Sequence, residues 1–240
     1  MPSFRHAPLS RRALLKGSLG AAAALALPER LAWAAPPASR LPLITREIPS
    51  TGERLPVVGL GTNAYSVTDP EELAARREVL EQMPRLGGSV VDTARVYGES
   101  EVVIGRLMKQ LGNRDRLFLA TKAPIRGEML PGEGELLRSL ERLQVERIDL
   151  MQIHNFHEIG TLFPRMLEWK QAGKVRYLGV STSVDEQYPQ LISALRKLPL
   201  DFIQVDYSLD NRSAADEVLP LAREQGVAVL INMPLGGRSG

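Results

Sequence analysis

The feature that most constrains the fold is the regular alternation of short apolar segments with amphipathic ones through residues 57–233. The apolar segments are rich in Val, Ile and Leu and are typical of buried strands, whereas the segments between them have the 3.6-residue period of helices. Strands that alternate with helices predict a parallel sheet with right-handed crossovers. We predict strands at 57–62, 90–94, 117–122, 148–154, 175–181, 202–208 and 227–233, with helices at 70–86, 99–111, 132–143, 161–172, 186–197 and 214–225.

Such a sheet is either open and doubly wound or closed into a (β/α)8 barrel. No Gly-x-Gly-x-x-Gly turn follows the first predicted strand, which counts against a dinucleotide-binding open sheet. Polar residues instead recur where successive strands end, at Asp92, Lys122, His154 and Ser181. The carboxyl ends of barrel strands meet on one rim, where the active sites of such barrels lie. The sequence therefore predicts a (β/α)8 TIM barrel.

A phenol follows the first of these strand ends, because Tyr97 lies five residues after Asp92. A tyrosine has an ordinary pKa near 10, and a neighbouring ammonium group lowers such a value. We expect Lys122 to supply that ammonium, Asp92 to hold it and His154 to donate to a carbonyl oxygen. An acid aimed at an oxygen, without a nucleophile or a metal, suits carbonyl reduction. The hydride must then come from a nicotinamide cofactor.

Residues 92–105, with the pattern D-T-A-x-x-Y-G then S-E-x-x-I-G, resemble the signature of the aldo-keto reductase superfamily. The similarity runs from about residue 43 to 236. Further matching segments are G-L-G-T at 59–62, A-T-K at 120–122, L-x-x-I-H at 150–154, G-K-V-R-x-L-G-V-S at 173–181 and Q-V-x-Y at 204–207.

The resemblance implies a catalytic tetrad of Asp92, Tyr97, Lys122 and His154, in which Tyr97 is the general acid. It also implies NADPH as the cofactor, with its carboxamide held by Ser181 and Gln204. The remaining residues expected at the cofactor site are Thr62, Thr182, Asn232 and Leu235.

The chain departs from the family pattern in three places. Thr182 stands where the family usually has Asn, and Asn232 stands where an aromatic residue before the Pro-Leu-Gly turn stacks on the nicotinamide. Loss of that stacking face weakens cofactor binding by roughly 1 kcal/mol. The sequence also stops at Gly240, just after the seventh predicted strand. We therefore expect a truncated barrel without its eighth strand and without the segment that grips the adenosine phosphate in the family.

Composition excludes several classes of function. The chain has no cysteine, so disulfides, thiolate nucleophiles and cysteine metal sites are excluded. His154 and His157 have no third ligand nearby in the sequence, and we expect no metal site. Five of the 30 Lys and Arg residues, but one of the 28 Asp and Glu residues, lie in 1–34, so residues 35–240 hold 25 basic and 27 acidic residues. A mildly acidic body argues against nucleic-acid binding.

The basic residues near the N-terminus belong to a leader. Arg11 and Arg12 within S-R-R-x-x-L-K precede an apolar segment at 19–27 and a small-x-small cleavage pattern at 32–34. These are the parts of a secretory signal, and the arginine pair resembles that of a twin-arginine export signal; the apolar segment is too short to span a bilayer. The alternative is an uncleaved amphipathic helix at the N-terminus. We predict a signal peptide at 1–34, a disordered linker at 35–42 and the barrel at 43–240. Use of the signal, through the twin-arginine export machinery, gives a periplasmic protein; otherwise it is cytoplasmic.

The predicted function is NADPH-dependent reduction of an aldehyde or ketone. Two alternatives remain open. An inactive truncated barrel would retain only ligand or partner binding, and an aldolase-like barrel would use Lys122 for Schiff-base chemistry.

Overall fold

The computed structural model describes residues 42–123 and 134–236. All of them except Pro42 belong to one unit, which spans Leu43–Gly240. The predicted leader at 1–34 and all of the predicted linker except its last residue lie outside the described residues, as does the predicted start of a helix at 132.

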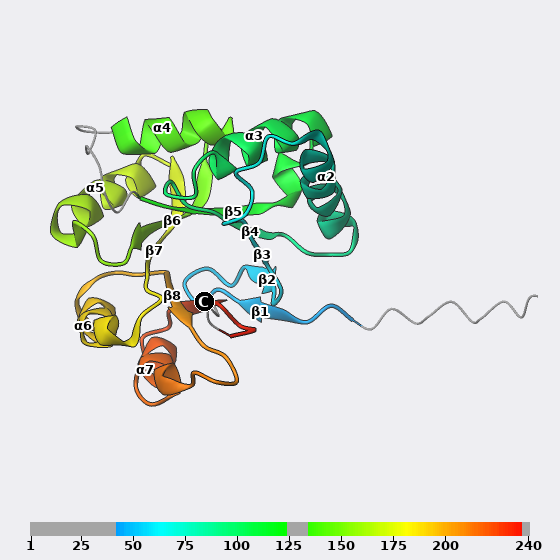
Figure 1. Ribbon diagram of the computed structural model, residues 1–240. Coiled ribbons are helices and arrows are strands. Elements are labelled where there is room, and N and C mark those ends of the chain that lie inside the picture. The colour runs from blue at the N-terminus through cyan, green and yellow to red at the C-terminus, as the bar shows by residue number, and fades with distance from the viewer. Residues whose placement is uncertain (1–41, 124–133, 237–240) are drawn as a thin grey trace, which may run out of the picture. The chain divides into compact units, whose positions relative to one another are not determined.

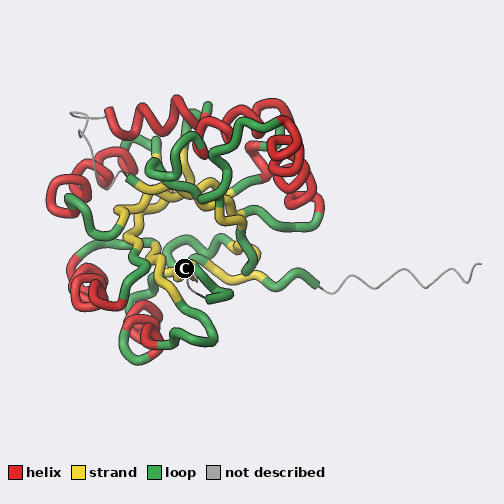
Figure 2. Tube along the Cα trace, in the orientation of Figure 1, coloured by secondary structure: helices red, strands yellow, loops and turns green. Residues whose placement is uncertain are grey.

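Seven parallel strands form one sheet that curves into a nearly closed barrel, with β3 at one edge and β9 at the other (Figures 1 and 2). Each strand pairs with the next one along the chain. The prediction of an incomplete (β/α)8 barrel is therefore confirmed. The strands are β3 (Leu60–Gly61), β4 (Val90–Asp92), β5 (Phe118–Lys122), β6 (Ile148–His154), β7 (Val175–Ser181), β8 (Phe202–Asp206) and β9 (Ala228–Asn232).

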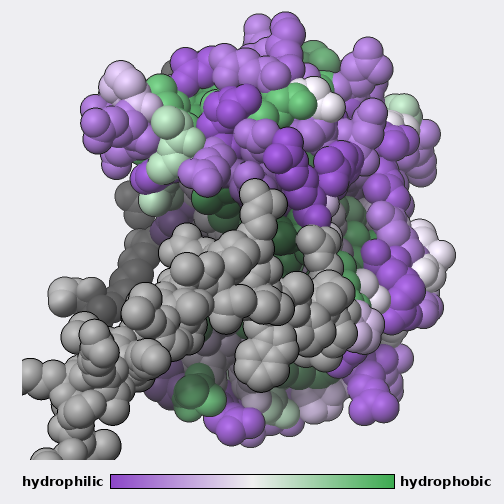
Figure 3. Space-filling model, turned by 90° about the vertical axis from the view of Figure 1, so that its right-hand side faces the viewer, coloured by the Kyte–Doolittle hydropathy of each residue, from purple (hydrophilic) through white to green (hydrophobic). Residues whose placement is uncertain are grey.

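Helices follow the strands and lie outside the ring (Figure 2). Their amphipathic sequences place apolar faces against the sheet, while much of the surface seen in Figure 3 is hydrophilic. The helices are α2 (Pro70–Arg85), α3 (Ser100–Leu111), α4 (Gly134–Leu143), α5 (Ile159–Gln171), α6 (Tyr188–Lys197) and α7 (Val218–Glu224), with 3-10 turns at Arg114–Arg116, Asp185–Gln187 and Ser213–Ala215. None of the helices in the described part of the chain is long and apolar enough to cross a membrane.

A β-hairpin precedes the barrel. Strands β1 (Thr45–Glu47) and β2 (Arg54–Pro56) pair antiparallel. Ile48, in the turn between them, is buried in a cluster with Val90, Phe118 and Tyr177. The hairpin therefore contributes an apolar side chain to the amino-terminal end of the barrel, which we call the base.

The residues of this cluster alternate with buried residues of a second core, because successive side chains of a strand point to opposite faces. On the face that carries this cluster, the side chains change from apolar to polar toward the carboxyl end of the strand. In β5 these side chains are Phe118, Ala120 and Lys122. Gly179 lies in such a row, and a Cβ there would come within 2.9 Å of the Phe202 carbonyl and 3.2 Å of Gln152 Cγ. The polar ends of these rows form the carboxyl-terminal rim.

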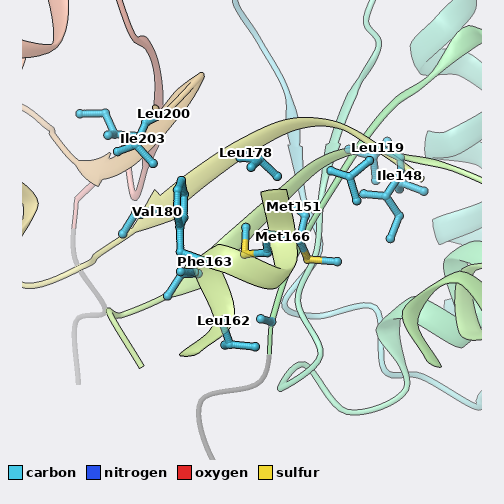
Figure 4. Close-up of a cluster of buried hydrophobic side chains, with 14 of the residues drawn as sticks. Leu119, Ile148, Met151, Leu162, Phe163, Met166, Leu178, Val180, Leu200 and Ile203 are labelled. Carbon is cyan, nitrogen blue, oxygen red and sulfur yellow. The ribbon is translucent and has the colours of Figure 1, made fainter. Parts of the chain in front are cut away.

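The larger core lies between the sheet and the helices. Figure 4 shows part of it, where Met166 of α5 lies beside Met151 of β6 and Leu178 of β7, and Phe163 lies near Val180. This layer supplies most of the apolar burial that drives folding.

The prediction was wrong in the extent of its first strand. The strand expected at 57–62 is reduced to Leu60–Gly61, because Val57 and Val58 are 50% and 76% exposed and Val57 N continues the hairpin by bonding to Ile44 O. Pro84 lies inside α2, which runs to Arg85 and so ends within one residue of the predicted bound. Pro84 has no N–H for the Leu80 carbonyl, and the Asn113 side chain donates to that carbonyl at 2.9 Å instead.

Candidate active site

A buried ion pair joins the ends of two neighbouring strands at the rim. Lys122 Nζ, at the end of β5, donates to both carboxylate oxygens of Asp92 at 2.8 and 2.7 Å and to the Thr93 carbonyl at 3.0 Å. The Lys122 side chain is only 3% exposed and that of Asp92 17%. All three ammonium donors thus have an acceptor, which a buried charge requires.

Two glutamines complete the surroundings of this carboxylate. Gln204 Nε2 donates to Asp92 Oδ2 at 3.0 Å, and Gln152 Nε2 lies 3.4 Å from Asp92 Oδ1 and 3.3 Å from Gln204 Oε1. Sequence reasoning missed Gln152. The signal was available, because Gln152 lies two residues before His154 on β6 and therefore on the same face of that strand.

Tyr97 lies beside the ion pair on the loop between β4 and α3. Its ring centroid is 5.5 Å from Lys122 Nζ, and the ring is edge-on to that of His154, with 6.2 Å between the centroids. The structure thus brings together all four residues of the predicted tetrad, which come from three neighbouring strands and one loop.

His154 is held in its neutral form. Burial, reinforced by the positive charge of Lys122 and opposed by Asp92, lowers the pKa of His154 from 6.5 to about 4. The His154 Nδ1 atom is buried and has no hydrogen-bond partner among the described residues. A neutral imidazole can donate one hydrogen bond and accept another, so this side chain can still bind a polar ligand.

The predicted cofactor residues divide into two groups. Ser181, Gln204 and Asn232 end or nearly end β7, β8 and β9, and Thr182 directly follows β7. Thr62 is fully buried, and its hydroxyl donates to the Asp92 carbonyl at 2.8 Å, so it ties β3 to β4. Leu235 is fully exposed in the turn after β9. The structure therefore gathers four of the six on neighbouring strand ends, while Thr62 contacts Asp92 and Leu235 makes no buried contact.

These rim groups fit an amide in part. Asn232 Nδ2 donates to the Thr182 carbonyl at 3.0 Å, while its buried Oδ1 has no donor among the described residues. That acceptor matches the N–H of a carboxamide. The Ser181 hydroxyl donates only weakly, to Ile153 O at 3.3 Å. Gln204, in contrast, already uses both ends of its amide inside the barrel.

The fold and this rim agree with the sequence comparison, in which the aldo/keto reductase family matches residues 57–239. The chain belongs to the aldo/keto reductase family, as the sequence resemblance predicted. It is 33% identical over 187 residues to an aldo-keto reductase of Strobilurus tenacellus, a match that covers 72% of this chain and 53% of that protein. It is 32% identical over 204 residues to aldo-keto reductase YhdN of Bacillus subtilis, covering 77% of this chain and 60% of the relative.

Solved structures give the same result. An aldo/keto reductase from Klebsiella pneumoniae in complex with NADP and acetate matches at a TM-score of 0.63 and 25% identity, over 77% of this chain and 66% of that one. The holo form of an aldo-keto reductase from Bacillus halodurans matches at a TM-score of 0.66 and 27% identity, over 79% and 65%. The chain spans about half to three fifths of the length of the two curated relatives.

Proposed function

We propose that the protein reduces an aldehyde or ketone to an alcohol, with NADPH as the reductant and Tyr97 as the general acid. The observation that carries this proposal is the buried Lys122 ammonium, which is held by Asp92 and lies 5.5 Å from the Tyr97 ring. An ammonium in this place can stabilise the negative charge that develops on the phenol oxygen as the proton is transferred. Family membership and the NADP complex of a structural neighbour support the choice of reaction.

In the proposed mechanism, the nicotinamide cofactor supplies the hydride that the carbonyl carbon receives. Tyr97 donates its phenolic proton to the carbonyl oxygen, so that an alcohol forms. Lys122 stabilises the phenolate left on Tyr97, and Asp92 keeps the ammonium in place. Neutral His154 orients the substrate by donating to the same oxygen. Asn232 and Ser181 would hold the carboxamide of the cofactor. Gln204 would join them if it gave up its hydrogen bond to Asp92 or the one from Gln152.

The preference for NADPH is part of the proposal. Among the relatives, one from Schizosaccharomyces pombe is named with NADP(+), whereas one from Escherichia coli is named an NADH-specific methylglyoxal reductase. A comparison of the two reduced cofactors with one aldehyde therefore tests this choice directly. We expect a higher kcat/KM with NADPH, and equal or higher values with NADH would contradict it.

The activity itself is tested by mixing the protein with NADPH and a panel of aldehydes and ketones while following the absorbance of the reduced nicotinamide. We expect Tyr97→Phe to lower kcat by about 10³-fold, within the range for loss of a general acid. Tyr207→Phe is a matched control, because Tyr207 follows β8 and its hydroxyl accepts from Arg212 at 3.2 Å. Full activity in Tyr97→Phe would exclude Tyr97 as the acid.

A second candidate is a barrel that binds a ligand or partner without turnover. The engaged amide of Gln204 and the lack of an aromatic side chain at Asn232 favour it. Fluorescence titration with NADPH separates the two proposals, because absence of binding at millimolar cofactor favours the second. Schiff-base chemistry at Lys122 is disfavoured, since a salt-bridged ammonium is a poor nucleophile; borohydride trapping of a substrate carbonyl on Lys122 would support it.

We also propose export through the twin-arginine machinery, on the basis of Arg11 and Arg12 and the apolar segment that follows them. That pathway carries folded proteins, so a cofactor can be bound before transport. Replacing both arginines with lysine should keep the protein in the cytoplasm, and cell fractionation measures this. An unchanged periplasmic fraction in the double variant would contradict the proposal.

A further inference from the structure

A buried carboxylate behind the site takes no part in the proposed chemistry. Glu101 of α3 is fully buried. Its Oε1 accepts from the hydroxyl of Thr121, the neighbour of Lys122 on β5, at 2.8 Å. Its Oε2 accepts from Arg142 Nε of α4 at 3.0 Å and lies 3.8 Å from Arg95 Nε. A buried charge of this kind persists only where it is paired and hydrogen-bonded.

Arg142 connects this carboxylate to the loop that carries Tyr97. While its Nε donates to Glu101, its Nη2 donates to the carbonyl of Gly98 at 2.5 Å. Gly98 directly follows Tyr97 in the chain. The guanidinium fork therefore fixes a backbone atom one residue from the proposed acid, from a helix that contributes no residue to the tetrad.

Gly105 explains how α4 comes near enough for this contact. A Cβ at Gly105 would lie 2.5 Å from the Arg142 carbonyl oxygen and 2.6 Å from the Leu143 carbonyl carbon. Glu101 and Gly105 are four residues apart, so they share one face of α3. Both belong to the S-E-x-x-I-G pattern, and both contact the end of α4. Glu101 binds the Arg142 side chain, and Gly105 leaves room for the backbone of Arg142 and Leu143.

The loop is also fixed from the opposite side. Gly98 has a φ of +59°, and a Cβ there would lie 2.6 Å from Ser66 Oγ. That hydroxyl accepts from Glu99 N at 2.9 Å, and the Ser100 hydroxyl donates to Thr62 O at 3.0 Å. Because these contacts hold the loop from the β3 side, loss of Arg142 would free one side of it while the other remains attached.

We propose that Arg142 is a positioning residue, held by Glu101, that sets where the Tyr97 phenol lies relative to Lys122 and His154. The kinetic part of this inference rests on the proposed reductase function. The geometric part does not, because it concerns where the Tyr97 ring lies. Burial raises the pKa of Glu101 against the opposing effects of Thr121, Arg95 and Arg142, which agrees with a carboxylate that depends on its partners.

Steady-state kinetics of three variants test the kinetic part of the inference. Arg142→Ala should lower kcat about 100-fold and leave KM within about twofold, because misplacing a catalytic group affects the chemical step. Arg142→Lys keeps a cation beside Glu101 but lacks the fork, so we expect about a tenfold loss. Arg138→Ala is the matched control, since Arg138 is exposed on the same helix. Wild-type kcat in Arg142→Ala, or a rise in KM alone, would overturn the proposal.

The Tyr97 ring itself provides a readout that does not depend on turnover. The chain has five tyrosines, so 13C-tyrosine labelling gives a spectrum in which Tyr97→Phe identifies the Tyr97 signal. Arg142→Ala should shift or broaden that signal and leave those of Tyr177 and Tyr207 unchanged, with a smaller change in Arg142→Lys. An unmoved Tyr97 signal in folded Arg142→Ala would overturn the inference, and so would failure of both Arg142 variants to fold. A moved signal in a protein without turnover would support the positioning role and reject the reductase proposal.

Discussion

The base and the rim of the barrel both contain buried or partly buried charges, but their polar atoms are satisfied to different degrees. At the base, Asp149 accepts from Arg114 at 2.7 Å, from Arg176 at 2.8 Å and from Leu119 N at 2.8 Å. Glu53 of the hairpin accepts from Arg176 and from the Tyr177 hydroxyl. These bonds join the hairpin to the strand ends, so the charged side chains Asp149, Glu53 and Arg176 of the base are paired with one another.

The rim, in contrast, keeps unsatisfied atoms. Five buried side-chain atoms in the described residues lack a hydrogen-bond partner, and four belong to the rim and the layer below it, namely Thr93 Oγ1, Gln152 Oε1, His154 Nδ1 and Asn232 Oδ1. Leaving a buried polar group unpaired costs about 1–3 kcal/mol. The comparison indicates that the same barrel uses charge for stability at one end and keeps polar groups available for a ligand at the other, as in other TIM barrels.

The largest expected effect comes from breaking the rim ion pair. Lys122→Met should destabilise the protein by about 3 kcal/mol, because it leaves the Asp92 carboxylate without its counter-ion. The double variant Asp92→Asn/Lys122→Met should recover most of that loss and remain inactive. Urea unfolding measures both. Arg176→Met at the more exposed base should cost only about 1 kcal/mol. A double variant no more stable than Lys122→Met would contradict this account of the rim.

A second effect concerns pH. The folded state lowers the pKa of His154 to about 4, below the unfolded value of 6.5, so the unfolded state binds the proton more readily. Stability should therefore fall as the pH decreases from about 6.5 to about 4, by about 3 kcal/mol. His154→Gln should remove this dependence, whereas His157→Gln should retain it. Unfolding free energies across that pH range provide the measurement, and equal slopes in wild type and His154→Gln would contradict the prediction.

The smallest expected effect is that of removing the Tyr177 hydroxyl, and it compares the base with the rim most directly. The Tyr177 hydroxyl lies 2.6 Å from Glu53 Oε2 and 2.8 Å from Thr51 Oγ1, so Tyr177→Phe should lower stability by about 1.5 kcal/mol. Its activity per folded molecule should equal that of wild type. Tyr97→Phe should show the opposite pattern, with little change in stability and a large loss of turnover. If Tyr177→Phe impaired turnover while its stability stayed unchanged, the division between base and rim would fail.

Much of the architecture could be predicted because its signals are local. Strands β6 and β7 have the predicted bounds, since their continuous apolar runs have clear ends. Helix α7 begins at Val218, four residues later than predicted, because a 3-10 turn occupies Ser213–Ala215. The prediction of a strand at 57–62 was wrong for another reason. Val57 is apolar, but its backbone N–H bonds to Ile44 O beside the hairpin and not to a barrel strand. Apolar character alone does not show which neighbour a segment pairs with.

The order of apolar and polar residues along the chain by itself determined the alternating fold and a rim with Asp92, Lys122 and His154, because strand periodicity and chain direction place strand ends together. The tetrad with Tyr97 came from the resemblance of residues 92–105 to the family pattern. Only the tertiary structure decided the rest. It joined Gln152 and Gln204 to Asp92, and it brought Arg142 to the loop of Tyr97. These contacts join residues about 40 to 110 positions apart, so they depend on barrel closure and helix packing, which no local pattern encodes.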